Sequence, residues 1–187
     1  MPTQERLDAI ADAAVAVVAS GGARALTHRA VDARAGLPIG STSFSVRTRH
    51  DLLRLTLRRI TATTQAGLDS ISVPDRLSVD QALHLAETVL EHLATTPAPH
   101  RARMALLLEL EDEDRAELTD RAPVRRQLLA AARQLLVALG SPDPAARSVD
   151  LVGLIDALVL YRSLDIAPVD STTVLRAFLR DSARVPS

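Results

Sequence analysis

The chain has 187 residues, 2% aromatic residues, no cysteine and a formal net charge of −1. This length can bury a core without staples, and the lack of cysteine excludes a disulfide framework and thiolate chemistry. The charge is unevenly divided: residues 1–60 hold nine Arg and five acidic residues, whereas residues 61–187 hold thirteen Arg and eighteen acidic residues. A basic N-terminal part on an acidic remainder is typical of a protein that docks one end on a polyanion.

Two short helices joined by a glycine turn are predicted after a first amphipathic helix over residues 7–19. Thr27 has the features of an N-cap for a helix that ends at Ala35, and Gly36 suits a left-handed turn. Pro38 suits the entry to a third short helix, which ends near Ser45. Two short helices with a tight turn form a candidate helix-turn-helix.

Helical patterns continue to the C-terminus, and the alternation expected of strands is missing, so the sequence predicts an all-α fold of about nine helices. The further helices are expected at His50–Leu68, from the cap Ser78 to before Pro97, at Arg101 to about Glu113, at Pro123–Leu139, at Pro144 to about Leu164, and at Ser171–Ser182. No apolar run approaches the ~20 residues that span a bilayer, so we expect a soluble, cytoplasmic protein.

The helix after Pro144 is apolar nearly all round between Leu151 and Leu160, so it must be covered on two sides. The last helix carries a compact apolar stripe. A monomer of this size has trouble covering both helices, and we therefore expect a homodimer. The expected interface residues are Leu151, Ile155, Leu158, Val174 and Phe178.

An ordered set of short motifs points to a family. The set consists of Leu26-Thr27, Ala30-Val31, Ala35-Gly36-Leu37, Gly40-Ser41-Thr42 and Leu52-Leu53. It resembles the N-terminal signature of TetR (tetracycline-repressor) family transcription regulators, over about residues 6–60. The resemblance implies a helix-turn-helix DNA-binding domain at residues 1–48 and a helical ligand-binding and dimerisation domain at residues 49–187. We expect no cofactor.

The resemblance also implies which residues contact the DNA operator. They are Thr27, His28, Arg29, Ile39, Gly40, Ser41, Thr42, Ser43, Phe44, Arg47 and Arg49. Two positions depart from the family pattern, with Ser43 where a Tyr is usual and Val46 where a Phe is usual. Because Ser43 lacks the phenol that commonly reaches phosphate, we expect that contact to pass to Thr27, Ser41, Thr42 and Arg49.

Alternatives remain open for the most telling of these residues. Phe44 either packs on a thymine methyl or sugar, or fills the core of the domain. Arg47 and Arg49 are either phosphate clamps or solvated surface charges.

An enzyme is the rival class of function. His84, Glu87 and Glu91 have helical spacing that could bind a metal, but they lie opposite an apolar stripe, which favours a solvated face. No glycine-rich phosphate loop or nucleophile elbow is present. We therefore expect neither an enzyme nor a metal site.

Four polar residues among apolar neighbours are candidate ligand contacts: His92, Glu109, Asp156 and Tyr161. Asp156 could instead bond a neighbouring helix, Glu109 could pair with an Arg, and His92 could be a boundary histidine. If they converge, the ligand is mainly apolar with one or two hydrogen-bonding groups. The sequence thus predicts a dimeric repressor that a small molecule releases from a near-palindromic operator, or alternatively a ligand-independent DNA-binding or adaptor protein.

Overall fold

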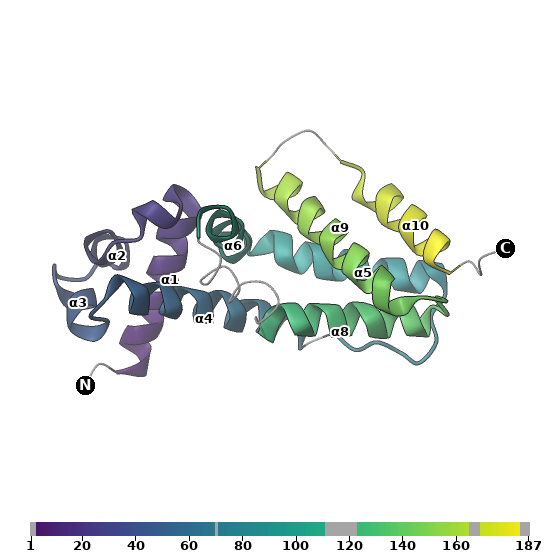
Figure 1. The fold of residues 1–187 in the computed structure, drawn as a ribbon, viewed down its shortest axis with the longest axis horizontal. Coiled ribbons are helices and arrows are strands. Elements are labelled where there is room, and N and C mark those ends of the chain that lie inside the picture. Colours follow the sequence, from purple (N-terminus) through teal and green to yellow (C-terminus); the bar gives the residue numbers. More distant parts are fainter. Residues whose placement is uncertain (1–2, 70, 111–122, 165–168, 184–187) are drawn as a thin grey trace. The chain divides into compact units, whose positions relative to one another are not determined.

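The computed structural model describes residues 3–69, 71–110, 123–164 and 169–183, and these ranges form helices and connecting loops only (Figure 1). The elements are α1 Gln4–Gly21, η1 Ala23–Ala25, α2 His28–Ala35, α3 Ser41–Ser45, α4 Arg49–Leu68, α5 Val79–Thr95, α6 Pro97–Glu109, α8 Pro123–Ala138, α9 Pro144–Leu164 and α10 Ser171–Ser182. The predicted all-α class is confirmed. None of the described helices combines the length and apolarity needed to cross a bilayer.

By packing, the described residues divide into two units. The head contains the residues up to 64 together with 98–110, and the body contains residues 65–97 together with the described residues from 123 onwards. Nearly all of α6 therefore packs with the head, and α4 contributes to both units. The boundary expected between residues 48 and 49 separates a DNA-binding part from a ligand-binding part. Division of the chain by packing does not test that boundary.

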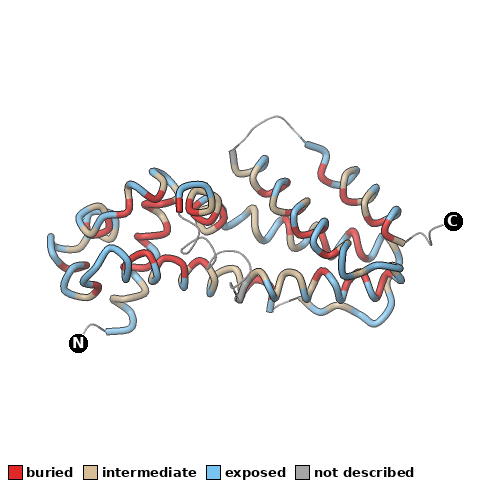
Figure 2. The backbone as a smooth tube through the Cα atoms, viewed as in Figure 1, coloured by how far each residue is buried: buried red, intermediate tan, exposed pale blue. Residues whose placement is uncertain are grey.

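The head packs α1, α2, α4 and α6 around one apolar core. Its fully buried large side chains are Ile10, Val18, Leu26, Val31, Leu52, Ile60 and Leu106. The stripe predicted on α1 faces this core, since Ile10, Ala14 and Val18 recur at helical spacing and are buried. Figure 2 shows how buried and exposed segments alternate along the helices. Val46, smaller than the family's usual residue, is buried as well.

Local capping explains where the head helices begin and end. The Thr27 hydroxyl accepts a hydrogen bond from the Ala30 amide at 3.2 Å, and Gly36 ends α2 with a φ of 65°, as predicted. Thr48 caps α4, because its hydroxyl accepts from the Asp51 amide at 3.0 Å.

The predicted start of the third helix is wrong by three residues. Residues 38–40 form a turn in which the Ser41 amide donates to the Pro38 carbonyl, and Gly40, with a φ of 91°, is the N-cap of α3. A left-handed residue cannot lie inside a right-handed helix, so Gly40 delays the start of α3 to Ser41.

The body packs α5, α8, α9 and α10 around a second core. Its fully buried large side chains are Leu90, Leu136, Leu151, Leu175 and Leu179. Ser78 and Gln81 form the capping box of α5, and Gly140, with a φ of 81°, follows the end of α8.

The prediction that a helix starts at Arg101 is wrong, because α6 begins at Pro97. Both Pro97 and Pro99 lie in its first turn, where a proline does not break the backbone hydrogen bonds. The expected end near Glu113 lies outside the described residues.

Candidate DNA-binding surface and ligand pocket

A buried carboxylate on α2 holds the beginning of α3. Asp32 is 1% exposed, and its two carboxylate oxygens accept hydrogen bonds from the Gly40 amide at 2.7 Å, the Thr42 amide at 2.7 Å and the Thr42 hydroxyl at 2.6 Å. Burial alone would raise the pKa of Asp32, but the bonds from Thr42 and Gly40 and the nearby His28 lower it on balance. The carboxylate is therefore held ionised against the start of α3.

A second contact from α2 holds the end of α3. The Nε2 of His28 lies 2.8 Å from the Val46 carbonyl, to which it donates a hydrogen bond, since a carbonyl oxygen can only accept. His28, expected to contact DNA, is thus half-buried and engaged inside the head.

The outer side of the helix-turn-helix exposes apolar side chains. Ile39 is 84% exposed and Phe44 is 74% exposed, and Gly40 and Ser43 between them are exposed too. Of the two alternatives for Phe44, the core position is therefore wrong. Large apolar side chains exposed to this degree beside polar neighbours are typical of a contact surface.

Basic side chains flank this apolar surface. Arg29 on α2 and Arg47 after α3 are exposed. Arg49 is exposed as well, but its Nη2 donates to the Ala23 carbonyl at 2.9 Å, so one of its donors is used within the head. Of the three arginines expected to contact DNA, Arg29 and Arg47 are thus exposed, and Arg49 is partly engaged within the head.

Two of the expected phosphate contacts lie inside the head. Thr42 is fully buried and its hydroxyl donates to Asp32, and Ser41 is buried beside it. The expectation that Ser41 and Thr42 take over a phosphate contact is corrected accordingly: they support α3 from within. Thr27 is exposed, but its hydroxyl already accepts the capping bond from Ala30.

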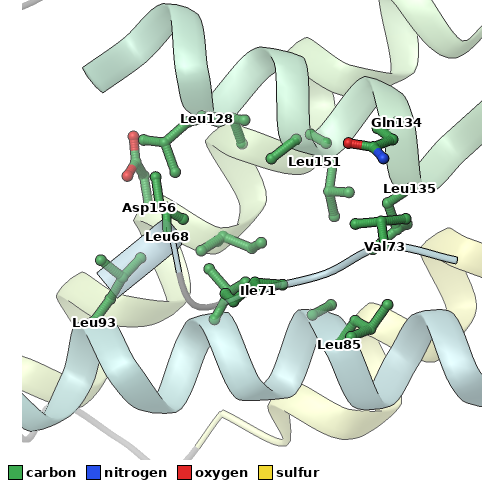
Figure 3. Close-up of a pocket in the computed structure, with 16 residues that line it drawn as sticks. Leu68, Ile71, Val73, Leu85, Leu93, Leu128, Gln134, Leu135, Leu151 and Asp156 are labelled. Carbon is green, nitrogen blue, oxygen red and sulfur yellow. The ribbon is translucent and has the colours of Figure 1, made fainter. Parts of the chain in front are cut away.

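The body contains an apolar pocket of about 80 Å³ between α5, α8 and α9 (Figure 3). Among its lining residues, Leu68, Leu93 and Leu128 surround Asp156 at one end, and Gln134 lies near the other. Asp156 is the one charged side chain in a lining that is otherwise apolar except for Gln134.

Of the four predicted ligand contacts, only Asp156 lines this pocket. Glu109 lies in the head, where its Oε2 accepts a hydrogen bond from the Ala23 amide at 3.0 Å. Tyr161 is 45% exposed on α9, outside the lining. His92 is exposed, and its ring lies against Gly67. Gln134 was not among the candidates selected from the sequence. The structure places it in the pocket lining, at an exposed position on α8.

The residues expected at the dimer interface mostly face inward. Leu151, Ile155 and Leu158 are buried in the body's own core, which corrects their assignment to an exposed contact face. Val174 is half-buried. Phe178 is half-buried as well, and the Arg147 guanidinium lies 5.5 Å from the centre of its ring.

A different face of α9 is exposed. Val149, Gly153, Ala157 and Tyr161 follow one another at intervals of four residues and are all exposed. Residues at this spacing share one face of a helix, and the small side chains of Gly153 and Ala157 allow another backbone to come close.

The metal-site alternative has no support in the described residues. No group of three or more metal-ligating side chains gathers there. Glu87 instead accepts a hydrogen bond from the Thr172 hydroxyl at 2.5 Å, and Glu91 pairs with Arg162 at 3.1 Å, so both carboxylates serve contacts between body helices.

Comparison with solved structures identifies the fold. No protein-family model and no curated protein matches the chain. A transcriptional regulator from Rhodococcus sp. RHA1 has the same fold, with a TM-score of 0.73 at 17% identity over 96% of this chain and 99% of the other. The structural neighbours include transcriptional regulators of the TetR family, and the chain has their all-helical fold.

Two further structures are more similar in sequence. A member of the TetR family from Streptomyces coelicolor A3 is 27% identical, with a TM-score of 0.66 over 98% of this chain and 100% of the other. The multidrug binding protein EbrR, complexed with imidazole, is 26% identical, with a TM-score of 0.66 over 100% of this chain and 96% of the other.

Proposed function

We propose that the chain is a dimeric, sequence-specific DNA-binding regulator that represses a gene and is released from its operator by a small, mainly apolar ligand. The observation that carries the DNA-binding part is the exposure of Ile39, in the turn before α3, and of Phe44, on α3. The backbone of α3 is fixed from within the head. Two large apolar side chains that stay in water contribute nothing to folding, so covering them with a partner is favourable. The thymine methyl and deoxyribose of a major groove offer such apolar contacts.

The dimeric part rests on the exposed face of α9. Its small residues Gly153 and Ala157, flanked by Val149 and Tyr161, fit an isologous contact with the same face of a second copy. A two-fold dimer presents two recognition helices, so the operator is a near-palindrome whose half-sites lie in successive major grooves.

The ligand part rests on the pocket in the body. Its apolar lining with a single carboxylate suits a mainly apolar molecule that carries one cationic or hydrogen-bond-donating group near Asp156. EbrR, with which this chain shares 26% of its residues, has been crystallised with imidazole and with proflavin, which are both nitrogenous bases. Ligands of that chemistry are the first to test here.

Ligand binding is coupled to DNA binding through α4 in this proposal. Leu68 at the end of α4 lines the pocket, while Arg49 at its beginning lies in the head. A volume of about 80 Å³ is small for a drug-sized molecule, so a ligand has to widen the pocket. Ligand binding then weakens operator binding only to the extent that the ligand binds the widened form more tightly than the form that binds DNA.

The small pocket also favours a second candidate, a regulator that binds DNA without any ligand. The two candidates differ in a thermal-shift screen of the full-length protein with apolar bases. A rise in the melting temperature that is accompanied by loss of operator binding supports the ligand-released repressor. A screen without such a compound, together with intact operator binding, supports the second candidate.

The DNA-binding proposal is tested by truncating the exposed apolar side chain of the recognition helix. Phe44→Ala is expected to weaken operator binding about tenfold, since one good base contact contributes roughly 1–3 kcal/mol of discrimination. Val137→Ala, which truncates a 58% exposed apolar residue of the body, is the control and leaves binding unchanged. Equal operator affinity for wild type and Phe44→Ala contradicts the proposed surface.

A further inference from the structure

The recognition helix α3 cannot hold itself in place. It has five residues, and isolated helices of that length do not persist in water because nucleation is too costly. Its N-cap, Gly40, has no side chain to satisfy the free amides of the first turn. Whatever orients α3 must therefore come from another element.

Two side chains of α2 supply that support at opposite ends of α3. Asp32 binds the Gly40 and Thr42 amides and the Thr42 hydroxyl, and His28 binds the Val46 carbonyl at 2.8 Å. His28 and Asp32 are four residues apart, so they share one face of α2. The carboxylate meets the end of α3 where amides are free, and the imidazole donor meets the end where carbonyls are free, which is the favourable pairing at each end.

We infer that His28 and Asp32 are positioning residues that set the orientation of α3 for reading base edges, and thereby the sequence specificity of the protein. This inference rests on the proposed DNA-binding function. Base edges are read only when the recognition side chains are held in place, whereas phosphate contacts from exposed arginines bind any sequence. Loss of the α2 support therefore reduces affinity for the operator and leaves affinity for unrelated DNA nearly unchanged.

A purely structural role makes a different prediction. In that case Asp32 and Thr42 merely fill the space between α2 and α3, and an apolar pair in their place serves equally well. Replacing both partners of a buried hydrogen bond by apolar groups is often nearly neutral for stability. The double variant Asp32→Ala/Thr42→Val separates the two roles, because it removes the buried hydroxyl together with the carboxylate but leaves the Gly40 and Thr42 amides without their acceptor.

The experiment measures three quantities on the full-length protein: the urea unfolding midpoint, the affinity for a selected operator, and the affinity for a scrambled duplex of the same length. Asp32→Ala is expected to lower the midpoint and to reduce the operator-to-scrambled affinity ratio about tenfold or more. The double variant recovers much of the midpoint but not the ratio. His28→Ala reduces the ratio less, because only one bond is lost.

Asp51→Ala is the matched control, since Asp51 is also a carboxylate of the head that bonds a threonine, Thr48 at the start of α4. It is expected to leave the affinity ratio unchanged. An unchanged ratio in Asp32→Ala, or a ratio fully restored in the double variant, overturns the inference.

Hydrogen exchange separates this inference from the proposed function. In Asp32→Ala the Gly40 and Thr42 amides are expected to exchange faster than in Asp51→Ala. If the wild type selects no operator at all, the proposed function fails. The inference fails separately if the Gly40 and Thr42 amides exchange at the same rate in Asp32→Ala as in the wild type, because Asp32 then does not hold the start of α3.

Discussion

The head buries a hydrogen-bonded carboxylate, whereas the pocket of the body is lined almost entirely by apolar side chains. In the head, the carboxylate of Asp32 and the hydroxyl of Thr42 are buried, while Ile39 and Phe44 are exposed. In the body, the pocket is lined by apolar side chains apart from Asp156 and Gln134, and the ion pairs Arg147–Asp181 and Arg176–Asp80 lie on the exposed surfaces of its helices.

The two units are held together by different kinds of contact. Directional hydrogen bonds of 2.6–2.7 Å around Asp32 fix one arrangement of α2 and α3, which suits a rigid reading surface. The apolar contacts around the pocket are non-directional, so they favour no single spacing of α5, α8 and α9. The hydrogen bond from Arg162 on α9 to Glu91 on α5 joins exposed side chains away from the pocket lining. The head is built for a single geometry, and the body tolerates an altered one.

The largest expected effect comes from a charge placed in the body's core. Leu158→Arg buries an unpaired guanidinium where Leu158 is 4% exposed, and it should lower the free energy of unfolding by at least about 4 kcal/mol. Ala157→Arg, one residue away on the exposed face, should lower the free energy of unfolding far less but produce monomers. Urea unfolding and light scattering measure the two effects. Equal behaviour of the variants in both assays is incompatible with the orientation of α9 described above.

A smaller effect is expected from neutralising the buried carboxylate of the head. Asp32→Asn should lower the free energy of unfolding at pH 7 by about 2 kcal/mol, because charge-assisted hydrogen bonds become neutral ones. The folded-state pKa of Asp32 lies below its ordinary value of 3.8, so its ionised form stabilises the head fully above that value. This contribution is lost as the pH falls through the folded-state pKa.

Urea unfolding of both proteins at pH 7 and at pH 3 checks this prediction. The gap between wild type and Asp32→Asn should be wide at pH 7 and should narrow at pH 3. A gap of the same size at both pH values speaks against an ionised Asp32 in the folded protein.

Filling the pocket sharpens the contrast further. Ala131→Leu adds an apolar side chain to the lining and should raise stability by up to about 1 kcal/mol while abolishing the thermal shift caused by any ligand found in the screen. Ala130→Leu, its exposed neighbour on α8, is the control and should keep the ligand response. A full ligand response in Ala131→Leu places the binding site elsewhere.

The smallest effect concerns the flanking arginines. Arg47→Ala should weaken binding to every DNA sequence alike and reduce the slope of log affinity against log salt by about one unit, since one phosphate contact is lost. Arg49→Ala should also weaken binding to all sequences and flatten the same slope, and in addition it loses the bond to the Ala23 carbonyl. Arg133→Ala, an exposed arginine of α8, is the control. If the slope of log affinity against log salt is unchanged in Arg47→Ala, this arginine does not contact phosphate.

The helices were predictable from the sequence because their signals are local. Caps such as Thr27 and Ser78, the left-handed Gly36 and the apolar stripes of α1 and α5 need no tertiary context. The exposed Phe44 remained ambiguous, since periodicity over a five-residue helix cannot tell the inside from the outside.

The long-range polar contacts could not be predicted. Asp32 carried no signal, because its partners Gly40 and Thr42 lie across a turn whose geometry the sequence leaves open. Glu109 and the Ala23 amide are 86 residues apart in the chain. On α9 the all-round apolar run concealed which face belongs to the core, so Leu151 and Leu158 were expected on the wrong side.

The most direct test of the central claim is selection from a random pool of DNA duplexes by the full-length protein, followed by affinity measurements on the winning sequence at several salt concentrations. We predict a near-palindromic sequence with two half-sites one helical turn apart or a multiple of that spacing, bound with an affinity that falls steeply with salt. Wild-type protein should enrich it, and Phe44→Ala should enrich it far less. A pool without any enriched sequence, or binding that is independent of salt, would contradict the assignment of the helix-turn-helix as a DNA-reading surface.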